Sequence, residues 1–298
     1  MKKALLYSIF ALSIASTTLT SCEDIFGGFL DKQPSNELTG EQVFSDWNLT
    51  VQFHLDTYNF LRHGAGRIST TWLDAATDLA ETSYGNGVRT SFNIGNFYGG
   101  SGASELVDTW EHYYRGIRKC NMLLTRIEEV PQNPADSEDK YNRDKKNYIA
   151  EARFLRAYFY WELFLRYGPI PIVTEVLDPD GDLMSKYTIR PTTKEYVVDF
   201  ILEELKSCED DLLDYKTAWT SSSAGRIGQP MACALRSRIM LFMASPRYSS
   251  ESGITWQQAA NVAKEFIDNY GTNFALFNDK DATGATLGIE NYTNALLR

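Results

Sequence analysis

The sequence predicts an all-α fold, in which helix–loop–helix units stack on one another and long irregular loops connect some of the helices. Apolar residues recur at three- and four-residue steps in most stretches after residue 39, which is the spacing of one helix face. Clusters of Gly and Pro separate these stretches and are typical of helix ends and loops. Small residues also face large ones in several stretches, which favours close packing between helices.

The first 21 residues have the three parts of a secretory signal peptide. Lys2 and Lys3 precede an apolar run from Ala4 to about Ile14, a polar stretch follows, and no acidic residue occurs before Glu23. The run is too short to span a bilayer, which takes about 20 apolar residues. We therefore expect residues 1–21 to be removed rather than kept as an anchor.

The stretch Leu19-Thr20-Ser21-Cys22 resembles a bacterial lipobox, in which the cysteine thiol takes a diacylglycerol group. Cys22 is then the lipid-attachment residue and the first residue of the mature protein. A plain signal peptide with a chance cysteine is the alternative. Residues 22–39 have few periodic apolar residues and contain Pro34 and two glycines, so they suit an extended tether.

The mature chain is expected to be acidic. Without Lys2 and Lys3 the number of basic residues falls from 29 to 27, against 39 acidic ones, which gives a formal charge of −12. Binding to phosphate backbones needs a basic patch. This charge therefore argues against a nucleic-acid partner.

Three cysteines remain after Cys22, namely Cys120, Cys208 and Cys233. Each falls in a predicted helix, and none has a CxxC spacing. An odd number cannot be fully paired, so we expect buried free thiols rather than a disulfide framework or a metal site.

Helices are expected on both sides of a long Gly-rich tract. Thr39 is a suitable N-cap for a helix with an apolar stripe from Val43 to Leu61, which His63-Gly64-Ala65-Gly66 ends. A short helix is expected from about Trp72 to Ala80. The tract from Ser83 to Ser104 contains six glycines and is typical of a loop.

The helical pattern is strongest from Glu105 onward. A broad apolar stripe runs from Leu106 to Ile127 and stops at Pro131, which cannot continue a helix. The next helix, from about Tyr141 to Tyr167, is apolar almost all round, so it has to be buried among other helices. Gly168-Pro169-Ile170-Pro171 ends it.

A further pair of helices is expected from about Thr193 to Asp214 and from about Gln229 to Ala244, and a helix from Trp256 to Tyr270 begins another unit. This succession resembles tetratricopeptide-like stacking, although the repeat consensus is not matched residue by residue. The final residues 291–298 supply neither a capping helix nor the polar end that stacked repeats need. We therefore expect residues 40–298 to form one helical domain that is truncated at its C-terminus.

No catalytic set emerges from the sequence. His54, His63 and His112 share no metal-ligand spacing, and we expect His54 and His112, which lie in predicted helices, to be hydrogen-bonded structural histidines. The motifs GxSxG and HExxH and the phosphate-binding P-loop are absent. We expect a protein that is not an enzyme and that uses no cofactor and no bound metal.

Acidic patterns leave further alternatives open. Asp74, Asp78 and Glu81 have helical spacings that place three carboxylates on one face, for a cation or an acid/base pair, but a solvated face or a cap of the following loop is favoured in so acidic a chain. Residues 279–290 follow the spacing of an EF-hand loop, but Thr283 stands where Asp or Asn is expected, so a plain surface loop is favoured. Asp178-Pro179-Asp180-Gly181-Asp182 has the wrong register for such a loop and predicts a turn.

The Gly-rich tract carries the candidate ligand-binding residues. Its aromatic rings lie outside any helical stripe, next to amide and guanidinium donors, and a pyranose offers apolar C–H faces and a rim of hydroxyls for such groups. The alternative is that the rings fold back and plug the loop onto the helices. Tyr248 and Trp219 are weaker candidates. The predicted ligand-binding residues are Tyr84, Asn86, Arg89, Asn96, Phe97, Tyr98 and Trp219.

Several stretches, taken in order, resemble the SusD family (SusD/RagB-like), the cell-surface nutrient-binding lipoproteins of Gram-negative glycan-uptake systems. The most specific is Glu151-Ala152-Arg153-Phe154-Leu155-Arg156-Ala157, followed by Tyr167-Gly168-Pro169-Ile170-Pro171. The others are Phe29-Leu30-Asp31 with Pro34, Trp110 with Tyr114, Ile117 and Asn121, Arg190-Pro191-Thr192, Gly225-Arg226-Ile227, and Ala244-Ser245-Pro246 with Trp256 and Ala259-Ala260. Arg247-Tyr248 departs from the Leu-Phe that many members have after Ser-Pro.

The resemblance implies a non-enzymatic binding protein on tetratricopeptide-like helices. Such a protein covers a TonB-dependent outer-membrane transporter (SusC-like), hands it oligosaccharides, and is held on the outer face by the lipid on Cys22, where Glu23 and Asp24 look like the export signal. Ligand residues differ among members, so none is carried over. A peptide-binding relative of the same fold and a protein–protein adaptor remain as alternatives.

Overall fold

The computed structural model describes residues 39–62, 73–81, 93–95, 104–178, 180–182, 187–218, 220 and 223–274. The chain divides into two compact units, Met1–Gln42 and Val43–Arg298. The prediction of an all-α fold is confirmed, because the described residues form helices and turns and contain no strand beyond one isolated bridge between Leu213 and Gly228.

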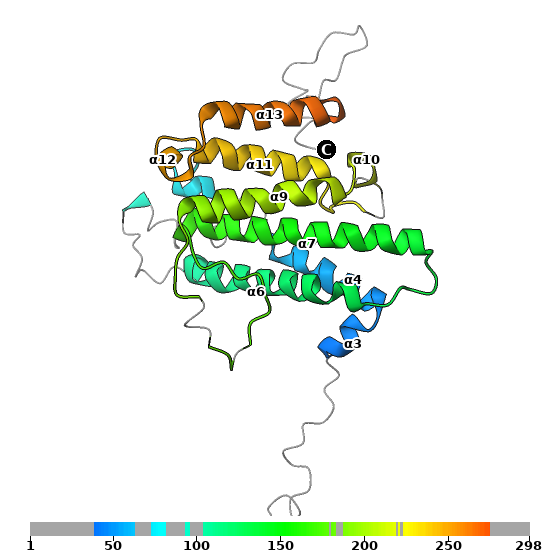
Figure 1. Cartoon of the computed structure of the whole chain (residues 1–298). Coiled ribbons are helices and arrows are strands. Elements are labelled where there is room, and N and C mark those ends of the chain that lie inside the picture. Colours follow the sequence, from blue (N-terminus) through cyan, green and yellow to red (C-terminus); the bar gives the residue numbers. More distant parts are fainter. Residues whose placement is uncertain are drawn as a thin grey trace, which may run out of the picture. The chain divides into compact units, whose positions relative to one another are not determined.

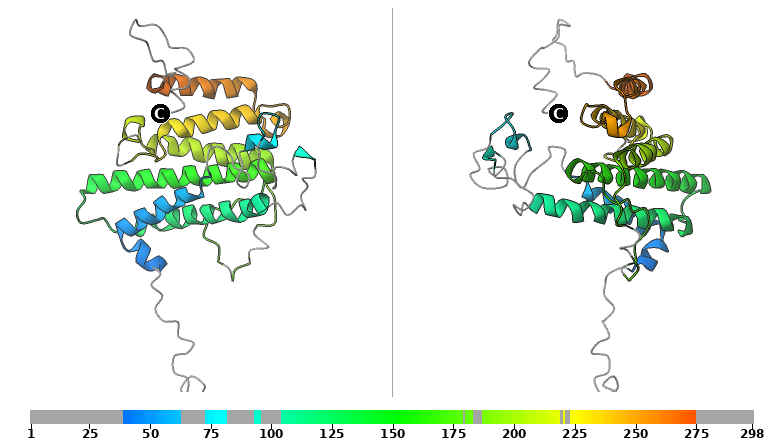
Figure 2. Two further views of the ribbon diagram at one scale, coloured as in Figure 1. Left: turned by 180° about the vertical axis from the view of Figure 1, so that it is seen from behind. Right: turned by 60° about the vertical axis from the view of Figure 1, so that its left-hand side comes forward.

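The long helices of the second unit lie side by side in the order of the sequence, as Figures 1 and 2 show. Each helix packs against the one before it, which is the neighbour-to-neighbour stacking expected of helical repeats. The stack consists of α6 (Ser104–Arg126), α7 (Glu138–Tyr167), η4 (Lys194–Leu202) continuing into α9 (Glu203–Cys208) and η5 (Glu209–Asp211), α11 (Gln229–Met243) and α13 (Trp256–Tyr270).

Shorter helices precede and connect the long ones. They are α3 (Gly40–Phe44), α4 (Trp47–Asp56), η1 (Thr57–Phe60), η2 (Leu73–Ala76), η3 (Ile127–Glu129), α10 (Tyr215–Ala218), α12 (Ser249–Ser252) and η6 (Gly271–Asn273). The short helix expected from Trp72 to Ala80 is thus a single 3₁₀ turn, and no helix continues from Ala76 to Ala80.

The prediction of one continuous helix from Thr39 to Leu61 is wrong in its middle. Thr39 does cap the first turn, since its hydroxyl accepts a hydrogen bond from the Gln42 backbone at 3.3 Å. The chain then breaks at Ser45, and the Asp46 side chain accepts from the Leu49 backbone at 2.9 Å. An N-cap of this kind starts a new helix.

The core forms between α6, α7 and the helices that follow. Tyr113 and Ile117 of α6 and Leu155 and Phe159 of α7 are buried together, with at most 1% of each side chain exposed. The prediction that α7 is buried almost all round is confirmed, because α6, α9 and α4 pack against different sides of it. The helix ends at Gly168, whose φ of +67° suits glycine.

The three cysteines are confirmed as free and buried thiols on α6, α9 and α11. Burial raises the pKa of Cys120 and Cys208 to about 12, so both stay protonated and behave as small apolar side chains.

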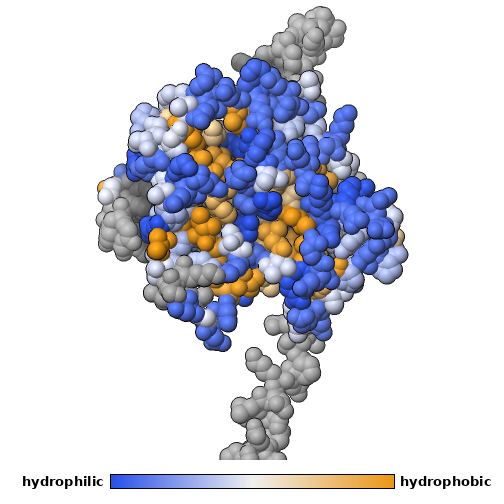
Figure 3. Space-filling view, viewed as in Figure 1, coloured by the Kyte–Doolittle hydropathy of each residue, from blue (hydrophilic) through white to orange (hydrophobic). Residues whose placement is uncertain are grey.

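Among the described helices, none is long and apolar enough to cross a membrane. The space-filling view shows apolar side chains gathered in the middle of one face of the stack, with hydrophilic side chains around them (Figure 3).

Candidate functional site

The predicted ligand-binding residues lie outside the described residues. This holds for Tyr84, Asn86, Arg89, Asn96, Phe97, Tyr98 and Trp219, for the lipid-attachment residue Cys22, and for the EF-hand-like stretch 279–290. They stay predictions. From the same tract, Asn93 is described, and its side-chain amide donates to the Ala75 carbonyl at 3.2 Å.

Two minor alternatives are corrected by the structure. Asp74, Asp78 and Glu81 are exposed, and the 3₁₀ turn that holds Asp74 ends at Ala76, so the three carboxylates do not share a helix face. Tyr248 is a packing residue, because its ring stacks on Phe242 at a centroid distance of 5.2 Å and tilts against the buried Phe164 at 5.6 Å.

The structural roles predicted for the described histidines are confirmed. His112 bonds the Phe60 carbonyl at 2.9 Å. His54 is buried, and its Nε2 lies 2.9 Å from the Glu151 carboxylate.

Glu151 is the centre of a buried polar cluster that joins three distant parts of the chain. Besides His54, the carboxylate accepts hydrogen bonds from the Tyr58 hydroxyl at 2.7 Å and from the Arg226 Nε at 2.8 Å. Arg226 also donates to Asn147 at 2.8 Å. α4, η1, α7 and the loop before α11 are thereby linked at one carboxylate.

The charge of Glu151 is stabilised by these partners. Burial by itself raises the pKa of this carboxyl, but the hydrogen bonds from His54 and Tyr58 and the charge of Arg226 outweigh burial and hold the pKa below its ordinary value. The carboxylate is fully buried and bonded through both of its oxygens, so a ligand cannot reach it. The cluster therefore holds these segments together and is not a binding site.

Arg156, the second arginine of the stretch Glu151–Ala157, forms a similar link on the other side of α7. Arg156 donates to Asn121 of α6 at 2.9 Å and to Glu204 of α9 at 2.6 Å. Asn121 in turn donates to the carbonyls of Val173 and Glu175, both at 3.0 Å. Arg156 thus orients the amide that holds the extended segment after α7 against α6.

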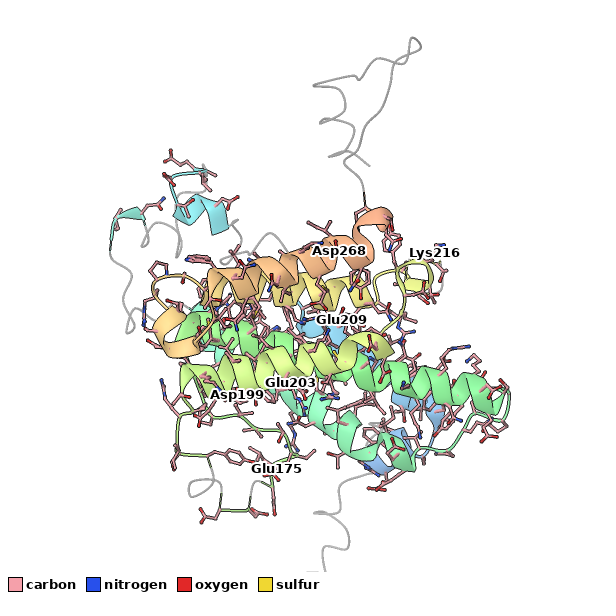
Figure 4. All side chains as sticks on the ribbon, turned by 45° about the horizontal axis from the view of Figure 1, so that its top comes forward. Glu175, Asp199, Glu203, Glu209, Lys216 and Asp268 are labelled. Atoms are coloured by element: carbon pink, nitrogen blue, oxygen red, sulfur yellow. The ribbon has the colours of Figure 1, made fainter. Side chains whose placement is uncertain are left out.

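That segment and α6 enclose the candidate site, a groove of about 370 Å³. Half-exposed Trp110 and Tyr114 supply its aromatic surface, and buried Ile117 and Val173 form its floor. The remaining lining residues, mostly exposed, are Glu111, Arg115, Arg118, Asn121, Glu175 and Leu177. Glu175 is labelled on the extended segment in Figure 4.

The aromatic pair of the groove is held in place by packing and hydrogen bonding. The rings of Trp110 and Tyr114 lie 4.9 Å apart at 43°, and the Tyr167 ring meets Trp110 edge-on at 5.2 Å. The Tyr114 hydroxyl donates to the Pro171 carbonyl at 2.9 Å. Burial raises the pKa of Tyr114, so the hydroxyl stays a donor.

A third set of titratable side chains, Glu209, Cys233 and Glu265, lies close enough together to hold a metal ion. Figure 4 shows Glu209 at the end of α9, beside α11. Arg236 donates to Glu209 at 2.5 Å and to Glu265 at 3.1 Å, and Lys206 donates to Glu265 at 2.9 Å. The two carboxylates are already paired with cations, so this set is a salt-bridge cluster that joins α9, α11 and α13.

Sequence reasoning missed the groove. Trp110 and Tyr114 fit the apolar stripe of α6, so periodicity alone assigns them to the core. Their spacing of four residues, next to Glu111, Arg115 and Arg118 on the same helix, was the available signal. The segment after α7 is held on α6 by hydrogen bonds such as those from Asn121 to Val173 and Glu175, and no local pattern predicts these contacts.

Comparison with known proteins gives a consistent result. The family described as starch-binding and associating with the outer membrane, SusD-like, matches residues 28–241. The curated SusD-like protein P38 of Formosa agariphila is 24% identical over 228 residues, which cover 74% of this chain and 41% of that protein.

Solved structures share the fold. A SusD-like carbohydrate-binding protein from Bacteroides fragilis superposes with a TM-score of 0.57 at 20% identity, over 76% of this chain and 41% of that one. A laminarin-binding SusD-like protein gives a TM-score of 0.56 at 20% identity, over 81% and 46%. The chain spans less than half the length of these relatives. Since the family match covers most of its sequence, the chain belongs to the SusD-like family.

Proposed function

We propose that this protein is a cell-surface lipoprotein that binds oligosaccharides or polysaccharides and delivers them to a TonB-dependent outer-membrane transporter. Membership of a family described as starch-binding and associating with the outer membrane carries the proposal. A structural neighbour described as laminarin-binding supports the same ligand class.

The signal and the lipid site support the location. The sequence up to Ser21 has the parts of a signal peptide, and Cys22 ends a lipobox-like stretch. We propose that the lipid on Cys22 holds the protein on the outer membrane, facing the cell exterior, with residues 22–39 as a tether. The acidic mature chain disfavours nucleic acid as a partner.

Binding without catalysis is part of the proposal. In the described residues the buried carboxylates Glu151 and Glu209 and the half-buried carboxylate Glu204 are each paired with an arginine. Such pairs stabilise helix contacts, so these three carboxylates are not poised as a general acid or base. The ligand is instead held by stacking and hydrogen bonding in the tract from Tyr84 to Tyr98.

Substitution of Phe97 or Tyr98 by Ala tests the proposed site. One ring stacked on a sugar face, with one or two hydrogen bonds, is worth about 1–3 kcal/mol, so each variant should bind about ten- to a hundredfold more weakly. Calorimetry with the best ligand from an oligosaccharide array measures the affinity, and thermal unfolding serves as the control. A lower melting temperature with unchanged affinity would mean that the rings are plugs.

A further inference from the structure

The groove between α6 and the segment after α7 lies outside the predicted ligand tract, and its lining has the chemistry of a ligand site. We propose that this groove is a second carbohydrate subsite, in which Trp110 and Tyr114 stack on the apolar face of a neutral pyranose ring. The inference rests on the proposed glycan-binding function and adds a site to it.

The aromatic surface is preformed. Trp110 is 40% exposed, although indole is among the largest apolar side chains. Its ring is supported edge-on by Tyr167, and Tyr114 is fixed by its bond to Pro171. A platform whose rotamers are already fixed loses little conformational entropy when a ligand binds.

The rim of the groove complements the hydroxyl groups of a sugar. Glu111 and Arg115 lie one helical turn apart, 3.9 Å between their charged groups, and both are exposed. Arg118 donates to the Leu177 carbonyl at 3.2 Å through one of its five N–H groups. The carboxylates of Glu111 and Glu175 and the guanidinium groups of Arg115 and Arg118 surround the aromatic rings. They supply both hydrogen-bond acceptors and donors and equal numbers of opposite charges. This favours an uncharged polyhydroxyl ligand over an anion or a lipid tail.

The size of the groove also favours a sugar over a docked helix. A volume of about 370 Å³ is near the lower end of the range of about 300–1,000 Å³ for ligand pockets. A docked helix needs apolar anchors over several turns. Here the apolar lining of α6 ends at Asn121, whose amide is already bonded to Val173 and Glu175.

The test uses the purified protein and an oligosaccharide array that includes maltoheptaose and laminarihexaose. The best ligand is titrated calorimetrically into the wild type, Trp110→Ala and the matched control Trp256→Ala. Trp256 is 56% exposed on α13 and does not line the groove. Trp110→Ala should bind about tenfold more weakly, as expected for the loss of one stacked ring, and Trp256→Ala should match the wild type.

Trp110→Phe separates binding from folding, because it keeps a ring in the packed position. It should keep the melting temperature of the wild type and lose the ligand-induced change in tryptophan fluorescence that Trp110 contributes. If Trp110→Ala binds like Trp256→Ala, or if Trp110→Phe keeps the full fluorescence change, the groove is not a sugar subsite, while wild-type binding still supports the proposed function. If the wild type binds no oligosaccharide on the array, both proposals are wrong.

Discussion

Glu151 shows why a sequence motif of this family can be specific without touching ligand. Its carboxylate is fully buried and accepts hydrogen bonds from His54, Tyr58 and Arg226, which are 75 to 97 residues away in the sequence. Removing one member of a buried charge cluster leaves the others without a counter-charge, which costs more than the cluster contributes while intact.

We predict that Glu151→Gln lowers the free energy of unfolding by about 3 kcal/mol or more. Glutamine has nearly the same shape but leaves the half-buried Arg226 beside a neutral group. Glu128→Gln is the matched control, since Glu128 pairs with Lys145 at the surface and should cost less than about 1 kcal/mol. Urea unfolding of both variants measures the difference, and equal effects would contradict the structural role of Glu151.

The same carboxyl makes stability depend on pH in one direction. Because the pKa of Glu151 is lower in the folded protein than its ordinary value, its ionised form adds stability above the unfolded pKa of about 4.3, and that stability is lost as the pH falls through the folded-state pKa. The gap in unfolding free energy between the wild type and Glu151→Gln should therefore narrow on acidification. A gap that widens would mean that the carboxyl is protonated in the fold.

At the scale of helices, the contact between α6 and α7 depends on a glycine. A Cβ on Gly116 would lie 2.8 Å from the ring of Phe159, which is fully buried, so the ring or the helix would have to shift. Close approach of two helices at a residue without a side chain explains how α7 can be covered on this side by large rings of α6.

We predict that Gly116→Ala lowers the free energy of unfolding by about 1–3 kcal/mol, the usual cost of overpacking a core. Gly271→Ala is the control, because its Cβ would make only an ordinary contact with Ile267 at 3.5 Å. Thermal unfolding of the two variants gives the comparison. If Gly116→Ala is as stable as the wild type, the helices are not packed as closely as described.

The helices were the part of the fold that the sequence could predict, because a stripe of apolar residues is repeated over many turns. The places where the helices break or change their hydrogen bonding could not be predicted from the apolar periodicity. The break at Ser45 comes from one capping side chain, Asp46, and the π-helical turns of η4 shift the hydrogen bonding by one residue within an unbroken apolar pattern. The candidate groove was missed for a third reason, since it is made by a contact between segments about 50 residues apart.

At the scale of the whole molecule, we propose that a lipid on Cys22 holds the binding surface at the membrane. We predict that Cys22→Ser blocks acylation and leaves the precursor unprocessed by the lipoprotein signal peptidase. Labelling with radioactive palmitate and detergent partitioning measure both steps. A variant that still matures and carries the label would show that Cys22 is not the attachment residue.

The central claim is that the protein binds a glycan without changing it, and one measurement tests it directly. Purified protein is titrated with the oligosaccharide from the array that binds most tightly. After prolonged incubation the ligand is recovered, and its molecular mass is measured by mass spectrometry. Saturable binding with recovery of the intact ligand is the predicted result. The absence of binding to every oligosaccharide tried would contradict the claim, and so would shorter products whose release is lost when Asp74 or Asp78 is replaced.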